Sequence, residues 1–165
     1  MKIKVFFPVV LVLMGLTGCS PVSGPEKGSI APDFTLPVMG EQAESFTLSK
    51  TVETQPLLIV FWATWCPSCV DEIPQLNEWH EQLAAKGLKI YGINVGESAQ
   101  EIKAFMQAQP ILYPVLLDTE SRVAARYGLA GLPAAVLLAK GGKILYYGFS
   151  LPPDPGALLD EESPR

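Results

Sequence analysis

The chain has 165 residues, of which 48% are hydrophobic and 18% are charged, and its formal net charge is −5. This length suits one domain of ordinary size, and the acidic balance argues against binding to nucleic acid. The sequence contains no basic cluster, no low-complexity block and no internal repeat, which excludes the repeat architectures.

The N-terminal segment has the pattern of a targeting peptide. Lys2 and Lys4 supply positive charge, and Val5–Leu16 is an uncharged, mostly apolar run with the length of a signal-peptide core. A membrane-spanning helix needs about 20 apolar residues, so this run is short for a span. The segment therefore predicts an exported protein.

The end of this run resembles the lipobox of bacterial lipoproteins. Residues 16–19 read Leu-Thr-Gly-Cys, and in that family the chain is cut before the cysteine, which then carries lipid. The resemblance implies a signal peptide at 1–18, a lipid-anchored tether at 19–30 and a folded domain at 31–165. Two or more acyl chains on Cys19 would anchor the protein stably in the cell envelope, facing the periplasm or the cell exterior. The alternative is an ordinary signal peptide in which Cys19 is incidental.

The first half of the domain predicts three strands and one long helix. Short strands are expected at 34–36 and 46–48, on either side of a turn that contains Gly40. Residues 57–62 form a continuous apolar run, which is typical of a central strand buried on both faces. A helix is expected over about 66–85, stopping before a glycine.

That helix carries one apolar stripe. Its members follow each other at intervals of three and four residues: Cys69, Ile73, Leu76, His80 and Leu83. Pro74 lies inside the helix and is expected to kink it, because proline removes the hydrogen bond to the carbonyl of Val70.

The second half of the chain alternates strands and helices. The expected elements are a strand at 88–95, a helix starting at Ser98, a strand at 115–117, a helix at 121–127, and strands at 134–139 and 144–149. Ser98 and Glu101 form a capping box, and the Gly-Gly pair at 141–142 predicts a hairpin. Strands joined through helices pair in parallel. The order therefore predicts an α/β sandwich with a mixed central sheet.

The chemical motif of the chain is the Cys-Pro-Ser-Cys of residues 66–69, placed where the buried strand turns into the helix. Unpaired N–H groups and a partial positive charge at a helix N-terminus favour the thiolate, which is the nucleophile. We expect Cys66 to be exposed and to attack a substrate disulfide. We expect Cys69 to be buried and to resolve the mixed disulfide. Pro67 fits the first helical turn, where its missing N–H is no loss.

Two other interpretations of the pair are a structural disulfide and half of a zinc site. The chain has three Cys and one His, so if Cys19 is lipidated too few ligands remain for a four-coordinate zinc site. His80 lies fourteen residues beyond Cys66, about 21 Å along the helix. It therefore cannot serve as the base of Cys66, and we expect it at the edge of the core.

Residues 61–69, Phe-Trp-Ala-Thr-Trp-Cys-Pro-Ser-Cys, resemble the thioredoxin superfamily and, more narrowly, its TlpA/ResA-like branch of lipoproteins and periplasmic proteins. The Glu-Ile-Pro of 72–74, the Ala-Pro-Asp-Phe-Thr-Leu of 31–36 and an insertion at about 96–118 match the same branch. The resemblance implies a thioredoxin-like three-layer sandwich with a central insertion and a terminal β-hairpin. It also implies a thiol–disulfide oxidoreductase, for which we expect no cofactor.

The resemblance further implies which residues meet the substrate. Pro133 falls where the superfamily keeps a cis-proline beside the redox pair. Leu132 would present its backbone to an extended substrate as if pairing a strand. Trp65 and Pro67 belong to the same implied surface.

Glu72 resembles the acidic residue that this branch uses in place of the buried aspartate of cytoplasmic thioredoxins, whose position here is Val60. Glu72 lies three residues beyond Cys69, on the same face of the helix. A partly buried carboxylate there would have a raised pKa and could accept the proton of Cys69. The alternative is a solvated glutamate that the helix dipole favours in the first turns.

Resemblance to this branch favours a reductase of disulfides in exported proteins. Because the periplasm is kept oxidising, such a reductase implies a membrane thiol relay of the DsbD or CcdA type as electron donor. Ala134 stands where family members often have Thr or Glu, which weakens a dedicated role in cytochrome c maturation. Only residues 155–162 remain for a C-terminal helix.

Two alternative functions stay open from the sequence. A thiol peroxidase of related fold would use Thr64, two residues before Cys66, but neither Arg122 nor Arg126 matches the required arginine. A copper or assembly factor would bind copper(I) through the two thiolates, although no nearby Met or His completes such a site.

Overall fold

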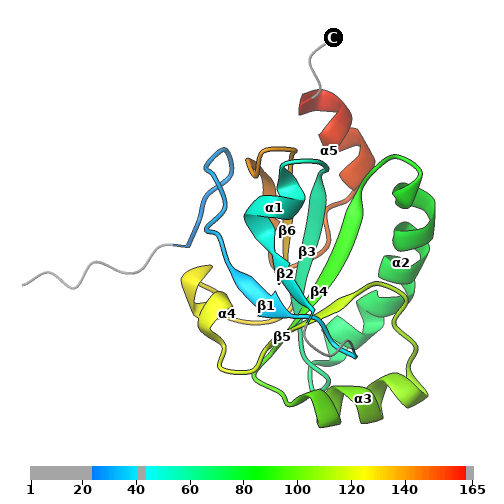
Figure 1. Ribbon diagram of the computed structural model, residues 1–165. Helices are drawn as coiled ribbons and strands as arrows, with labels where there is room; N and C mark the ends of the chain where they lie inside the picture. Colours follow the sequence, from blue (N-terminus) through cyan, green and yellow to red (C-terminus); the bar gives the residue numbers. More distant parts are fainter. Residues whose placement is uncertain (1–23, 41–43, 163–165) are drawn as a thin grey trace, which may run out of the picture.

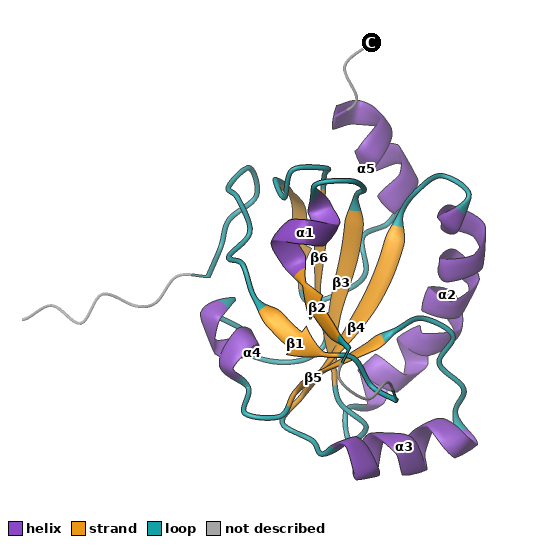
Figure 2. Ribbon diagram, in the orientation of Figure 1, coloured by secondary structure: helices purple, strands orange, loops and turns teal. Residues whose placement is uncertain are grey.

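A five-stranded mixed sheet lies at the centre of the computed structural model, which describes residues 24–40 and 44–162 (Figures 1 and 2). The strands follow the order β5–β4–β3–β6–β7 across the sheet. Their bounds are β3 Leu57–Trp62, β4 Lys89–Val95, β5 Val115–Asp118, β6 Ala134–Leu138 and β7 Ile144–Gly148. β3, β4 and β5 are parallel, whereas β6 and β7 are antiparallel additions. The predicted mixed sheet with a terminal hairpin is confirmed.

Helices cover both faces of this sheet and make the three layers (Figure 1). Side chains of α2, α3 and α5 pack on one face; these helices span Pro67–Ala84, Ala99–Ala108 and Pro155–Glu162. The other face carries α1 (Leu48–Val52), α4 (Arg122–Arg126) and a small hairpin of β1 (Thr35–Pro37) and β2 (Ser45–Thr47). The thioredoxin-like sandwich that the sequence predicted is therefore present, with α3 and β5 as its central insertion.

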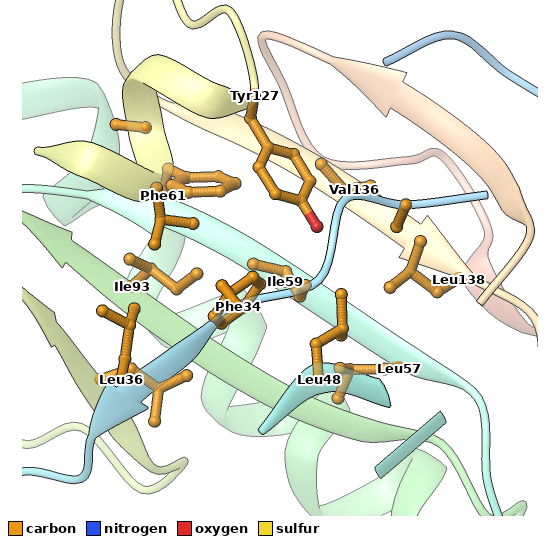
Figure 3. Close-up of a cluster of buried hydrophobic side chains, with 14 of the residues drawn as sticks. Phe34, Leu36, Leu48, Leu57, Ile59, Phe61, Ile93, Tyr127, Val136 and Leu138 are labelled. Carbon is orange, nitrogen blue, oxygen red and sulfur yellow. The ribbon is translucent and has the colours of Figure 1, made fainter. Parts of the chain in front are cut away.

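The core on the α1 and α4 face is built around one tyrosine, shown in Figure 3. The fully buried ring of Tyr127 packs against Phe34 and Phe61, with ring centroids 6.1 and 5.3 Å away. Its hydroxyl donates a hydrogen bond to the carbonyl of Pro32 at 2.9 Å, so the buried oxygen is satisfied. These contacts attach the N-terminal segment to the sheet.

Local signals in the sequence placed most elements within one or two residues. The capping box of α3 forms as expected, because the Ser98 side chain accepts from the Glu101 backbone and Glu101 reaches back to the Ser98 N–H. The hairpin between β6 and β7 places Gly141 and Gly142 at φ 87° and 84°, a conformation that favours glycine. α2 continues through Pro74.

One short helix was missed, because residues 46–48 were predicted as a single strand. Leu48 instead begins α1, where it and Val52 are four residues apart and both buried. Asp33 stabilises the start of this helix, since its carboxylate accepts the Ser49 N–H at 2.9 Å. The side chain that stabilises the start of α1, Asp33, therefore lies in another segment of the chain.

The last residues of the expected tether are hydrogen-bonded to the sheet. The backbone of Gly28 donates to the Ile144 carbonyl at 2.8 Å, and Ser29 accepts from the Ile144 N–H at 2.9 Å. These bonds attach the last part of the expected tether to the first residue of β7. The expected signal peptide and the lipidation site Cys19 lie outside the described residues. None of the helices in the described ranges has the length and apolar character needed to cross a membrane.

Candidate active site

Strand β3 and helix α2 together position the two cysteines. All six residues of β3 are buried, so the strand is held from both faces and its carboxyl end is a rigid starting point. After Ala63, Thr64 and Trp65, the chain reaches Cys66, which is the N-cap of α2 with extended backbone angles of −96° and 103°. Pro67 follows at the first helical position, where it needs no hydrogen-bond acceptor.

Cys66 and Cys69 form a disulfide, with their Cα atoms 5.3 Å apart. The sulfur of Cys66 accepts the backbone N–H of Cys69 at 3.3 Å, as a capping side chain does. The hydroxyl of Ser68 lies 3.6 Å from the same sulfur. On reduction, these two donors are positioned to stabilise a Cys66 thiolate.

The prediction that Cys66 is exposed is wrong for this disulfide form. Cys66 is only 4% exposed and Cys69 is 2% exposed. The physical reason is the capping geometry, which folds the Cys66 side chain back over the first turn of α2 rather than outward. The exposed positions are the neighbours: Trp65 is 68% exposed, and Pro67 and Ser68 are exposed as well.

Glu72 lies one turn beyond Cys69 and is half-buried. Burial raises the pKa of its carboxyl group above the ordinary value, and a hydrogen bond from the Leu151 backbone opposes that rise. Its other oxygen, Oε2, is buried without a hydrogen-bond partner among the described residues. Burial and, secondarily, the negative charge of Glu72 raise the pKa of Tyr113. The solvated alternative for Glu72 does not fit this environment, and neither Leu151 nor Tyr113 was evident from the sequence.

The implied proline loop lies at the same end of the sheet as the redox pair. The Leu132–Pro133 peptide bond is cis, and β6 begins immediately after it, with Ala134 opposite Phe61 of β3. Leu132 packs against the buried cluster that contains both cysteines. Pro133 is buried, whereas Leu132 is half-buried.

The remaining sequence candidates take structural positions. Val60 is buried among the cluster that includes both cysteines, so no acidic group on β3 faces the pair at that position. His80 is half-buried, and its ring lies 6.5 Å from that of Tyr113; burial lowers its pKa. It is therefore a residue of the core edge, as predicted. Among the described residues, no three His, Cys, Asp or Glu side chains gather in a way that could hold a metal ion.

One residue near the pair was missed by sequence reasoning. Glu97, between β4 and α3, is 8% exposed and binds Thr64 of the redox loop through both the backbone N–H and the hydroxyl. A glutamate just before a helix N-cap is usually solvated, so its sequence position carries no signal. Its bonds to Thr64, which is 33 residues away in the chain, distinguish Glu97 from a solvated glutamate, and they are visible only in the structure.

Together, the mixed sheet, the cysteine pair at the start of α2 and the cis-proline at the same end of the sheet define a thioredoxin-like protein with a dithiol–disulfide redox pair. The chain belongs to the AhpC/TSA family, whose sequence model matches residues 28–147.

Similar proteins agree with this class. Thiol-disulfide oxidoreductase ResA of Geobacillus thermodenitrificans is 31% identical over 117 residues, which cover 71% of this chain and 66% of that protein. The Bacillus subtilis protein of the same name is 32% identical over 124 residues, covering 72% and 65%. The chain thus spans about two thirds of the length of these relatives.

Solved structures show the same architecture. A Chlorobium tepidum protein assigned as the thiol:disulfide interchange protein DsbE has a TM-score of 0.71 and 28% identity, covering 82% of this chain and 94% of that one. The thioredoxin domain of a thiol-disulfide oxidoreductase from Bacteroides vulgatus, with a TM-score of 0.68 and 23% identity, covers 83% and 94% and supports the fold alone.

Proposed function

We propose that this protein is a thiol–disulfide oxidoreductase that reduces disulfides in exported proteins through Cys66 and Cys69. The observation that carries the proposal is the placement of the pair: Cys66 caps α2, and a half-buried carboxylate, Glu72, follows Cys69 by one turn. The named relatives and the DsbE-type neighbour are thiol–disulfide proteins, which supports the same chemistry.

The reaction transfers two electrons in two displacements. The thiolate of reduced Cys66 attacks one sulfur of a substrate disulfide, forming a mixed disulfide and releasing the first substrate thiolate. Cys69, deprotonated by Glu72, then attacks the Cys66 sulfur. The second substrate thiolate leaves, and the Cys66–Cys69 disulfide forms. Because Cys69 is 2% exposed, a base inside the protein is needed to take its proton.

The substrate contacts proposed for this reaction are Trp65, Pro67, Leu132 and Pro133. Trp65 and Pro67 are exposed beside the pair, and the half-buried Leu132 lies two residues before the first residue of β6. An extended substrate segment lying there could pair with the Leu132 backbone while its disulfide meets Cys66. Trp65 offers a large apolar surface to the flanking side chains.

The proposed direction is reductive. Residues 64–72 around the pair contain no Lys, Arg or His, and Glu72 lies one helical turn beyond Cys69. Within this segment, the groups that favour the thiolate are the helix N-terminus and the local hydrogen bonds. A strong oxidant requires a stabilised reduced form. A reductase outside the cytoplasm would draw electrons from a membrane thiol relay of the DsbD or CcdA type.

The proposed location is the cell envelope. Residues 1–18 would act as a signal peptide, Cys19 would carry lipid, residues 19–30 would form the tether and residues 31–165 the domain, as the lipobox pattern implies. Expression of the full chain and of Cys19→Ala tests this part. If Cys19 is lipidated, the wild type should partition into the detergent phase when membranes are extracted with detergent, and the variant should lose this partitioning.

The thiol peroxidase alternative finds little support in the site. The hydroxyl of Thr64 is bound to Glu97. Arg126 donates to the carbonyl of Asp33, and Arg122 pairs with Glu120 at the surface. Purified protein that consumed peroxide at the expense of its thiols would favour this alternative, and stoichiometric copper(I) binding would favour the copper factor.

The test of the proposed function is the reduction potential of the pair, followed by activity. A soluble form lacking residues 1–19 is equilibrated with thiol buffers while the fluorescence of Trp62 and Trp65 is recorded. A potential near or below about −230 mV supports a reductase, whereas one near about −120 mV indicates an oxidant. Insulin reduction with dithiothreitol then measures turnover. Cys69→Ser is the matched control, because it keeps the attacking sulfur but cannot resolve the mixed disulfide.

A further inference from the structure

Glu97 is a buried acidic residue outside the redox motif. It lies in the short connection between β4 and α3, directly before Ser98, the N-cap of α3. Only 8% of its surface is exposed. A buried charge is costly unless hydrogen bonds satisfy it. The hydrogen-bond partners of this carboxylate therefore show which parts of the structure it stabilises.

The Glu97 carboxylate is satisfied by the redox loop and by the sheet. Oε2 accepts the backbone N–H of Thr64 at 2.7 Å and the side-chain amide of Asn94 at 2.7 Å. Oε1 accepts the hydroxyl of Thr64. Asn94 is itself fully buried. Two of the three bonds therefore hold one residue, and they hold both its backbone and its side chain.

The parallel pairing of β3 with β4 brings these segments together. Trp62 and Asn94 are register partners at the carboxyl ends of the two strands. Both chains leave the sheet at the same edge, and Thr64 and Glu97 lie two and three residues beyond those partners. Thr64 is followed immediately by the exposed Trp65 and then by the N-cap Cys66.

We propose that Glu97 is a positioning residue for the redox pair, which holds Thr64 and thereby fixes the segment that presents Trp65 and Cys66. Glu97 touches neither sulfur; it acts through Thr64 and connects the central insertion to the redox loop. This inference rests on the proposed function, because the reaction needs Cys66 aligned with an incoming disulfide. A misplacement of about 1 Å can lower a rate by about 100-fold.

Two substitutions separate positioning from simple loss of a charge. Glu97→Ala removes all three bonds. Glu97→Gln keeps them: the amide oxygen can accept from the Thr64 N–H and from Asn94, and the amide nitrogen can donate to the Thr64 hydroxyl. We expect insulin reduction by the Ala variant to fall by about 10- to 100-fold and the Gln variant to stay within about threefold of the wild type.

The matched control is Glu101→Ala. Glu101 caps the same helix, α3, through Ser98 but has no bond to Thr64. The Glu101→Ala substitution therefore destabilises the insertion without releasing the redox loop, and insulin reduction by this variant should match that of the wild type. Should Glu97→Ala fail to fold, Thr64→Val carries the test. That variant loses the hydroxyl bond, keeps the backbone N–H bond and should be slowed by a factor between those of the Gln and Ala variants.

A second measurement keeps this inference separate from the proposed function. The alkylation rate of Cys66 in the reduced protein needs no substrate, and we expect Glu97→Ala to change it by at least about threefold while Glu101→Ala leaves it unchanged. Three results would overturn the positioning role: an Ala variant equal to the wild type, a Gln variant as slow as Ala, or a Glu101→Ala variant equally slow. A wild type that alkylates normally but reduces no disulfide would instead refute the proposed function.

Discussion

Reduction of the Cys66–Cys69 disulfide is expected to destabilise the fold. The two cysteines are three positions apart, and the chain-entropy relation for so short a loop predicts about 2 kcal/mol of extra stability for the oxidised form. Little in the site offsets this value: Glu72 opposes a nearby thiolate, and residues 64–72 contain no basic side chain. About 2 kcal/mol places the potential of the folded pair about 40 mV below that of the same pair in the unfolded chain.

The assay is a pair of urea titrations followed by far-ultraviolet circular dichroism, with and without excess dithiothreitol. The oxidised protein should unfold at a urea concentration higher by about 1 M, taking a slope of about 2 kcal/mol per M. A Cys66→Ser, Cys69→Ser double variant controls for the reagent and should show one midpoint in both buffers. A reduced form as stable as, or more stable than, the oxidised form would refute both the loop calculation and the reductive direction.

The further predictions concern three single side chains. Glu72→Gln should slow insulin reduction by about 100-fold; the wild-type rate should rise with pH through the raised pKa of Glu72, and the variant should lack that rise. The same raised pKa means that ionised Glu72 opposes folding, so the wild type should lose stability relative to the variant as pH rises above the ordinary value of 4.5. Trp65→Ala should lower insulin reduction by about tenfold and leave stability within about 0.5 kcal/mol, because the side chain is exposed. Tyr127→Phe should cost about 1 kcal/mol in urea unfolding, because the Pro32 carbonyl loses its donor.

For each of the three variants, one result would contradict the expectation. A Glu72→Gln variant with the wild-type pH profile would show that another group accepts the Cys69 proton. If Trp65→Ala slowed the reduction of a small disulfide as much as that of insulin, the side chain would act on the pair and not on the substrate. A Tyr127→Phe variant as stable as the wild type would mean that water replaces the lost donor.

Local patterns in the sequence were sufficient for most of the fold. The apolar run of β3, the capping box of α3 and the Gly-Gly hairpin each specify an element through residues that are neighbours in the chain. The redox motif is local as well, since a helical turn brings Cys66 and Cys69 together wherever the helix lies. These features could be predicted because their energies depend on short-range geometry.

The tertiary structure decided how the pair is embedded. The capping geometry turns the Cys66 side chain inward, but its burial is completed by a cluster that includes Ala135 and Leu137 of β6, far away in the sequence. The contact of Glu72 with Leu151 also joins distant segments. The same is true of the bond between Glu97 and Thr64, which spans 33 positions. Parallel pairing brings the carboxyl ends of β3 and β4 to one edge, but which side chain then becomes buried depends on packing from every layer. The residue types that carry the chemistry could therefore be predicted from the sequence. Their exposure, charge environment and supporting contacts were decided by long-range packing, because burial is a property of the whole fold.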